Sequence, residues 1–176
     1  MRKDPVTSNF VVVIIDMQDF FLRRFDAVVR KEVVANQQDI IDFCNKNGVP
    51  VVLVEYEGKG RGRTLSVLRN RIKKSLLVDV ISKPNNSAFR DTDLEGLMKE
   101  LKVRSMVLMG INASGCVQDT AIGALRRGYK IVTSRGVIAS SSVRDKYLNT
   151  SKKWYSKKGK FFESPEALKD FLQKIS

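Results

Sequence analysis

The chain has 176 residues, 43% of them hydrophobic, which is typical of one compact domain with a sizeable core, spanning residues 1–176. No apolar run near its start approaches the ~20 residues of a membrane-spanning helix. Two cysteines do not make a disulfide framework, so we expect a cytoplasmic protein without a membrane contact. The net charge of +13 needs a separate explanation.

The first half of the chain alternates predicted strands with a predicted helix. The apolar run FVVVIID, residues 10–16, is typical of a strand buried on both faces of a parallel sheet. A helix is predicted within residues 27–47, and Gly48 is expected to end it. The apolar face of this helix carries Val29, Val33, Ile40, Ile41 and Cys44. Further strands are predicted at residues 49–56 and within residues 77–82.

The second half continues the same alternation. In chain order we expect a helix with an apolar stripe starting at Leu94, a strand at 105–111, a helix at 117–127, a strand at 129–134, a helix within 141–153 and a strand at 160–163. Ser164 and Pro165 are typical of the start of a final helix. This pattern predicts a single-domain α/β fold, a doubly wound, mostly parallel six-stranded sheet with helices on both faces.

Three chemically useful residues follow predicted strands. Asp16 follows the first strand, Lys83 the third and Cys116 the fourth, and sites in open α/β sheets form beyond the carboxyl ends of the strands. Cys116 would also begin a helix, where the dipole favours a thiolate. Since the chain has no histidine, a carboxylate would have to accept the thiol proton. Each residue also has an ordinary structural explanation. A cysteine in an α/β domain is often only a small buried apolar residue, as is expected of Cys44. The residues alone therefore leave both the catalytic and the structural interpretation open.

Three segments carry a family resemblance. VVVIIDMQDFF, ISKPNNSAF and MVLMGINASGCVQDTAIGALRRGYKIV resemble, in this order, the signature blocks of the isochorismatase-like cysteine hydrolases, which include nicotinamidases, carbamoylsarcosine amidases, ureidoacrylate hydrolases and isochorismatases. The resemblance implies that Asp16 is the catalytic aspartate, Lys83 the catalytic lysine and Cys116 the nucleophile. It also implies a cis peptide bond between Ile111 and Asn112 and an oxyanion site at the Asn112 and Cys116 N–H groups.

The implied activity is hydrolysis of a small amide, ureido or carbamoyl C–N bond through a Cys116 thioester. Asp16 would act as general acid and base, and Lys83 as electrostatic support. Many family members carry a second aspartate where this chain has Phe20. In this respect the block is closer to that of the true isochorismatases, which cleave a vinyl ether and often lack the cysteine. Two alternatives therefore stay open. One is an isochorismatase-type vinyl-ether hydrolase, and the other is a non-catalytic protein whose basic surface binds nucleic acid or an acidic partner.

The substrate pocket and the cofactors follow from the same resemblance. The pocket candidates are Gln18, Phe21, Glu55, Glu57, Arg61, Arg63, Phe89 and Ser114. Family nicotinamidases have a histidine-rich cation site after the second strand, where this chain reads VEYEGKGRGR without a histidine. We therefore expect no cofactor, no metal and no activity on nicotinamide. The family commonly forms dimers or larger rings, so a homo-oligomer is expected.

The positive charge is concentrated in two segments. Residues 59–74 hold seven basic residues and no acidic one, and residues 141–160 hold seven basic residues and one acidic one, Asp145. Together they account for the whole net charge of +13. Both follow predicted strand ends, so each can approach the crevice and attract an anionic substrate. A solvated basic surface is the simpler interpretation, and nucleic acid is not the expected partner.

Overall fold

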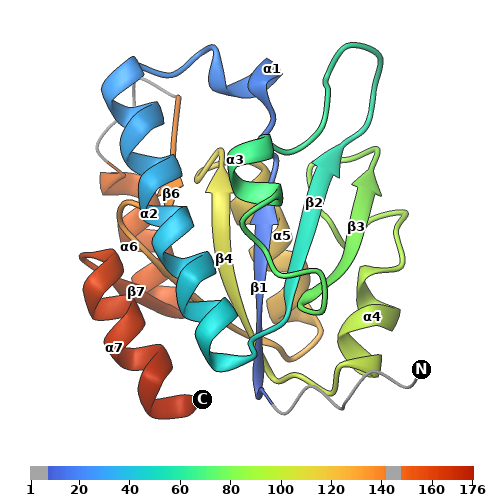
Figure 1. Ribbon diagram of the computed structural model, residues 1–176, viewed down its shortest axis with the longest axis vertical. Helices are drawn as coiled ribbons and strands as arrows, with labels where there is room; N and C mark the ends of the chain where they lie inside the picture. The colour runs from blue at the N-terminus through green and yellow to red at the C-terminus, as the bar shows by residue number, and fades with distance from the viewer. Residues whose placement is uncertain (1–7, 142–147) are drawn as a thin grey trace.

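A parallel sheet forms the centre of the molecule (Figure 1). The computed structural model describes residues 8–141 and 148–176. The strands are β1 (Phe10–Ile15), β2 (Val51–Tyr56), β3 (Leu77–Lys83), β4 (Ser105–Ile111), β5 (Lys130–Ser134), β6 (Ile138–Ala139) and β7 (Lys160–Phe162). Their order is β3-β2-β1-β4-β5-β7, β6 pairs with β4, and every pairing of these described strands is parallel.

The sheet has seven strands, where the sequence predicts six. The additional strand, β6, has only two residues, which pair with Gly110 and Ile111 at the end of β4. Two residues are too few to show the apolar periodicity of a strand. The prediction of six strands was therefore wrong, because it omitted β6. The predicted α/β class and the doubly wound arrangement are confirmed.

Helices lie on both sides of the sheet. They are α1 (Asp19–Leu22), α2 (Ala27–Asn47), α3 (Ser66–Arg69), α4 (Leu94–Glu100), α5 (Cys116–Arg126), α6 (Asn149–Lys158) and α7 (Pro165–Ile175). In Figure 1, α2, α3 and α7 lie in front of the sheet and α5 lies behind it. None of the helices in the described ranges is both long enough and apolar enough to span a membrane.

Most predicted helix ends agree with the structure. Gly48 ends α2 with φ 68°, and the Ser164 side chain accepts from the Ala167 N–H at the start of α7. The helix predicted within 141–153 is found at Asn149–Lys158, and residues 142–147 lie outside the described part of the chain. The four-residue helices α1 and α3 were not predicted, because one turn is too short for an apolar stripe.

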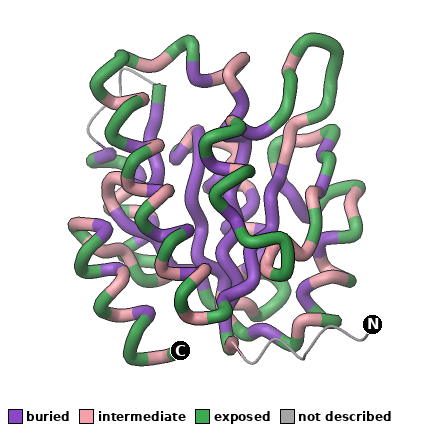
Figure 2. The backbone as a smooth tube through the Cα atoms, in the orientation of Figure 1, coloured by how far each residue is buried: buried purple, intermediate pink, exposed green. Residues whose placement is uncertain are grey.

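The core is centred on β1. All six residues of β1 are fully buried, since the strand has neighbours on both edges and helices on both faces (Figure 2). The chain passes from β1 outward to β2 and β3, then returns through α4 to β4 on the other side of β1. The carboxyl ends of β1 and β4 therefore flank the point where the strand order reverses, which is where open α/β sheets bind ligands.

The two strand ends approach closely at a glycine. Gly110 of β4 pairs with Ile15 of β1 and has φ +128°, and a Cβ at this position would overlap the Ile15 carbonyl oxygen. Ile15 directly precedes Asp16, and Gly110 directly precedes Ile111. The close spacing between the segments that carry Asp16 and Cys116 thus requires a glycine at position 110.

We predict that Gly110→Ala lowers the free energy of unfolding by at least about 3 kcal/mol, through backbone strain and overlap together. Gly128→Ala is the matched control, because Gly128 has φ +83° but open space around a Cβ. That variant should lose only about 1 kcal/mol. Urea unfolding measures both, and equal losses would contradict the close approach of the two strands.

Candidate active site

An aspartate and a lysine form a buried ion pair beyond the carboxyl ends of the strands. Asp16 follows β1 and Lys83 ends β3, and Lys83 Nζ lies 2.9 Å from Asp16 Oδ2. The Lys83 side chain is 0% exposed and that of Asp16 is 2% exposed. Lys83 Nζ also donates to the Asn85 carbonyl oxygen at 3.1 Å and lies 4.0 Å from the centre of the Tyr56 ring. The ammonium therefore has three partners inside the protein.

The Asp16 carboxylate keeps one oxygen unpaired. Its backbone φ of 55° lies in the left-handed region, which is uncommon for a residue other than glycine. Among the described residues, Asp16 Oδ1 is buried and has no hydrogen-bond partner. Burial raises the pKa of Asp16 above its ordinary value, although the charge of Lys83 and the nearby Cys116 thiol oppose the rise. A carboxylate in this state is a stronger base than a surface aspartate.

Cys116 is the first residue of α5 and is half-buried. Its thiol donates to Asn86 Oδ1, with 3.8 Å between sulfur and oxygen. Burial, followed by the charge of Asp16, raises the pKa of Cys116 to about 12, against the opposite effect of Lys83. The resting thiol is therefore protonated. Burial and the charge of Asp16 thus act against the thiolate that the helix N-terminus was expected to favour.

Two backbone N–H groups, one at the first residue of α5 and one in the turn before it, have no acceptor among the described residues. In the described part of the chain, neither the Asn112 N–H nor the Cys116 N–H donates to a protein oxygen. The peptide bond between Ile111 and Asn112 is cis. Asn112 Oδ1 accepts from the N–H and the hydroxyl of Ser141, both at 2.9 Å, which holds this turn in place. Unpaired amides beside a sulfur can stabilise negative charge that develops on a carbonyl oxygen.

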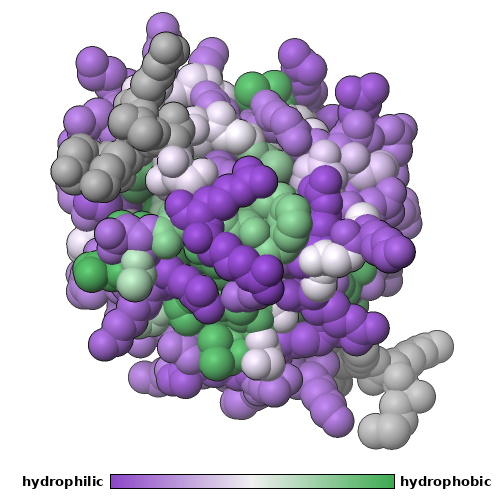
Figure 3. Space-filling view, turned by 90° about the horizontal axis from the view of Figure 1, so that it is seen from above, coloured by the Kyte–Doolittle hydropathy of each residue, from purple (hydrophilic) through white to green (hydrophobic). Residues whose placement is uncertain are grey.

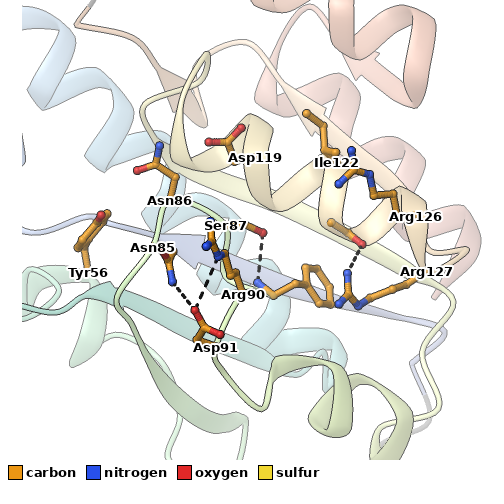
Figure 4. Close-up of a pocket in the computed structure, with 12 residues that line it drawn as sticks. Tyr56, Asn85, Asn86, Ser87, Arg90, Asp91, Asp119, Ile122, Arg126 and Arg127 are labelled. Atoms are coloured by element: carbon orange, nitrogen blue, oxygen red, sulfur yellow. Dashed lines mark hydrogen bonds and ion pairs between the residues drawn. The ribbon is translucent and has the colours of Figure 1, made fainter.

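A cavity of about 810 Å³ adjoins these groups. Tyr56, Asn85 and Asn86 form its end next to the ion pair and the thiol, since they contact Lys83 or Cys116. Figure 4 shows the cavity continuing between the loop after β3 and α5. In the view from above the strand ends, hydrophilic side chains surround a patch of hydrophobic ones (Figure 3). The cavity has room for a small molecule beside the thiol.

The sequence matches the family model of the Isochorismatase domain over residues 10–151. The chain belongs to the isochorismatase family. It is 22% identical to Nicotinamidase 3 of Arabidopsis thaliana over 158 residues, which cover 79% of this chain and 77% of that protein.

Two solved structures share the fold of this isochorismatase-family hydrolase. The N-carbamoylsarcosine amidase from Thermoplasma acidophilum has a TM-score of 0.75 and 20% identity, covering 89% of this chain and 96% of its own. The MAR1 ribonuclease from Caenorhabditis elegans has a TM-score of 0.79 and 22% identity, covering 99% and 92%. The likeness to these structures shows the fold, and the names show that the fold hosts different reactions.

Three predicted pocket residues lie at the cavity or at its Tyr56 end. The Phe21 ring lies 5.9 Å from the Tyr56 ring, measured between centres, and the Arg61 guanidinium carbon lies 4.3 Å from the centre of the same Tyr56 ring. Phe89 lines the cavity, with the Arg127 guanidinium 4.8 Å from its ring centre. In this isochorismatase-family chain these predicted residues therefore place aromatic and basic groups at or beside a wall that also contains acidic and amide side chains.

Other predicted pocket residues have different roles. Gln18 is fully buried, and its amide group bonds to the backbone of Tyr56 and Gly62 at 2.8 Å each, so it fixes a loop and is not free to orient a substrate. Arg63 is exposed and does not line the cavity. Ser114 is exposed, and its hydroxyl lies 3.2 Å from the Ser140 hydroxyl.

Three site residues were missed by the sequence analysis. Tyr56 ends β2, and Asn85 and Asn86 follow β3 after Pro84. Polar residues after a predicted strand were the available signal, since KPNN places two amides shortly beyond Lys83. The contact of Asn86 with Cys116 joins segments 30 residues apart in the chain, and no local pattern indicates it.

The metal site expected in nicotinamidases does not fit the residues of this chain. Glu55 accepts from the Thr64 N–H at 2.8 Å and pairs with Arg69 at 3.3 Å, and Glu57 accepts from the Ser82 hydroxyl at 3.3 Å. Within residues 8–141 and 148–176 no group of three or more His, Cys, Asp or Glu side chains could hold a metal ion. We therefore derive no step through a metal.

The ion pair leads to a stability prediction. Lys83→Met should lower the free energy of unfolding by about 3–5 kcal/mol, because it leaves the buried Asp16 carboxylate without its cation. Lys99→Met is the control, since Lys99 and Glu95 form an exposed pair at 2.8 Å whose loss should cost less than about 1 kcal/mol. Guanidinium unfolding compares the two variants. Similar losses would show that Asp16 and Lys83 do not depend on each other.

Proposed function

We propose that this chain is a cysteine-dependent hydrolase that cleaves the C–N bond of a small amide, ureido or carbamoyl compound. The observation that carries the proposal is the unpaired, buried Oδ1 of Asp16 beside the protonated Cys116 thiol. A base with a free oxygen, a thiol and a cation that supports the base are the groups that acyl transfer through a thioester requires. The family and the shape of the cavity are consistent with this reaction.

In the first half of the reaction, Cys116 Sγ attacks the carbonyl carbon while its proton passes to Asp16. The Asn112 and Cys116 N–H groups would receive the oxyanion that forms. When the tetrahedral intermediate collapses, the C–N bond breaks and Asp16 returns the proton to the leaving nitrogen. The products of this half are ammonia or an amine and a thioester on Cys116.

In the second half, Asp16 accepts a proton from water as the water oxygen adds to the thioester carbonyl. The C–S bond then breaks, and the proton returns to the sulfur. One water is consumed, and the acid or carbamate leaves. Lys83 stays protonated throughout and stabilises the Asp16 carboxylate each time the carboxylate is restored.

The pKa values support proton transfer that is coupled to attack. The pKa of Cys116 is raised to about 12 and that of Asp16 is raised by burial, so the proton rests on sulfur until the C–S bond begins to form. Sulfur loses basicity as that bond forms, and the carboxylate then becomes the better acceptor. The raised pKa of Asp16 makes this transfer easier, because a catalytic base works best when its pKa lies near the operating pH.

The direct test is a screen of amides and ureas for ammonia release. Cys116→Ala should lower kcat/KM by at least about 1000-fold, because it removes the nucleophile. Cys44→Ala is the control, since Cys44 is fully buried on α2 and remote from the proposed chemistry. A substrate that Cys116→Ala still hydrolyses at the wild-type rate would refute the thioester mechanism.

The same variants separate the proposed reaction from two other activities, vinyl-ether hydrolysis and RNA cleavage. Vinyl-ether hydrolysis of the isochorismatase type does not require a thiol, so that activity would survive in Cys116→Ala. Because one solved neighbour is named a ribonuclease and this chain carries a net charge of +13, RNA cleavage should be assayed in parallel. RNA cleavage that survives in both Cys116→Ala and Asp16→Asn would favour a function outside the proposed site.

A second prediction concerns the state of the thiol. Because the Cys116 pKa is about 12, alkylation by iodoacetamide should accelerate about tenfold per pH unit from pH 7 to pH 9 without a plateau. The charge of Asp16 contributes to that high pKa. Asp16→Asn should therefore lower the pKa and speed alkylation at pH 8 by at least about threefold, while hydrolysis is lost.

Asp19→Asn is the control for this experiment, since Asp19 is a partly exposed residue near the end of β1 that pairs with Arg23. Its alkylation rate should stay within about twofold of the wild-type rate. Slower alkylation in Asp16→Asn, or a plateau below pH 8, would mean that Cys116 rests as a thiolate and that Asp16 does not act as its base.

A further inference from the structure

The loop between β2 and α3 is fastened to the strand that carries Asp16. Gln18 lies two residues after Asp16 and donates from Nε2 to the carbonyl oxygens of Tyr56 at 3.1 Å, Arg61 at 3.4 Å and Gly62 at 2.8 Å. Its Oε1 accepts from the Tyr56 N–H at 2.8 Å. Since Gln18 is fully buried, these bonds fix the backbone of the loop relative to the ion pair.

The Arg61 side chain packs against the backbone of the loop at Gly58. A Cβ at Gly58 would lie 2.9 Å from Arg61 Nε, and Gly58 has φ +137°. Only glycine at this position leaves room for the side chain without strain. The guanidinium carbon of Arg61 consequently rests 4.3 Å from the Tyr56 ring centre, 5.4 Å from that of Phe21 and 5.6 Å from that of Phe20.

This guanidinium has aromatic neighbours and, in the described part of the chain, no ion-pair partner. Within the described residues Arg61 forms no ion pair, and its side chain makes no hydrogen bond. The two acids nearest to this loop in the sequence, Glu55 at the end of β2 and Glu57 in the loop itself, are engaged elsewhere, Glu55 with Arg69 and Glu57 with Ser82. A cation–π contact uses the face of the guanidinium, so the N–H donors at its edge stay available.

The free cation lies beside the proposed chemistry. The Tyr56 ring that contacts Arg61 also contacts Lys83 Nζ, at 4.0 Å from the ring centre, and Tyr56 lines the cavity. Arg61 also acts electrostatically on Asp16 across this short span. Arg61 does not itself line the cavity, so an anionic group that it held would lie at the Tyr56 end of the cavity, one aromatic ring away from the ion pair.

We propose that Arg61 is a specificity-determining residue that binds a carboxylate of the substrate, so that the substrate class is a small amide or urea carrying a carboxylate. The planar guanidinium can donate two parallel hydrogen bonds to a carboxylate, which orients the molecule as well as attracting it. This inference rests on the proposed hydrolysis at Cys116.

Matched pairs of compounds test the inference. Succinamate and butanamide differ chiefly in the terminal carboxylate, as do N-carbamoylglycine and ethylurea, and hydrolysis of all four can be followed by ammonia release. The wild-type enzyme should prefer the anionic member of a pair. Arg61→Ala should lower kcat/KM for the anionic member by about 10- to 100-fold and leave the neutral member within about twofold. Arg61→Lys should recover part of the loss, because it keeps the charge without the planar fork.

Lys59→Ala is the matched control, because Lys59 is an exposed cation on the same loop. It should change neither member of a pair by more than about twofold. The preference for the anionic member should also weaken as ionic strength rises. Equal losses on both members in Arg61→Ala, or an equal effect of Lys59→Ala, would overturn the inference.

A binding measurement separates this inference from the proposed function. Cys116→Ala should bind succinamate more tightly than butanamide by calorimetry, and Arg61→Ala in the same background should abolish the difference. If wild-type enzyme hydrolyses none of the four compounds while this Arg61-dependent binding is found, the proposed hydrolysis fails and the carboxylate site stands. If hydrolysis depends on Cys116 but the carboxylate brings no gain in rate or binding, the carboxylate site fails alone.

Discussion

The buried ion pair between Asp16 and Lys83 is the interaction on which the rest of the site depends. Both side chains are removed from water, which costs free energy that their attraction recovers only with good geometry and further partners. Lys83 has such partners in the Asn85 carbonyl oxygen and the Tyr56 ring. Asp16 does not, because its second oxygen is buried without a hydrogen bond in the described structure. In the proposed reaction this unpaired oxygen accepts the proton, and its burial without a partner is the stability cost of that role.

The sheet makes this pair possible. β2 lies between β1 and β3, so an acid after β1 and a lysine at the end of β3 are separated by a strand, and the long lysine side chain spans that gap above Tyr56 at the end of β2. On the other side, β4 leads into α5 and so brings Cys116 toward the same point. The strand order reverses between β1 and β4, which leaves the crevice open between the acid and the thiol.

The strand pattern places Asp16, Lys83 and Cys116 after predicted strands, because buried strands are recognisable in a sequence, but only the family resemblance implies that these residues act as acid, cation and nucleophile. It could not predict the state of the thiol, since the pKa of Cys116 depends on burial and on Asp16, which lies 100 positions earlier in the chain. The prediction that Gln18 orients a group in the pocket also lacked information about contacts between residues distant in the sequence. Its side chain donates to the carbonyl oxygens of Tyr56 and Gly62, about 40 residues later in the chain. These contacts exist only once the chain has folded. Short elements such as β6 were missed because they form only against an existing neighbour.

The charge distribution shows the difference between composition and local electrostatics. Within residues 59–74, Arg69 pairs with Glu55 at 3.3 Å and Arg71 with Asp42 at 2.6 Å, so part of that segment is neutralised by acids from other elements. In the later basic segment Lys152 pairs with Glu163. A surface charge that is paired or solvated is screened within about 10 Å at ordinary salt concentration. Arg61 differs because it is partly buried against aromatic rings and its charge reaches Asp16. Under the proposed function, Arg61, which has no ion-pair partner among residues 8–141 and 148–176, would therefore bear on specificity more directly than the net charge of the whole chain.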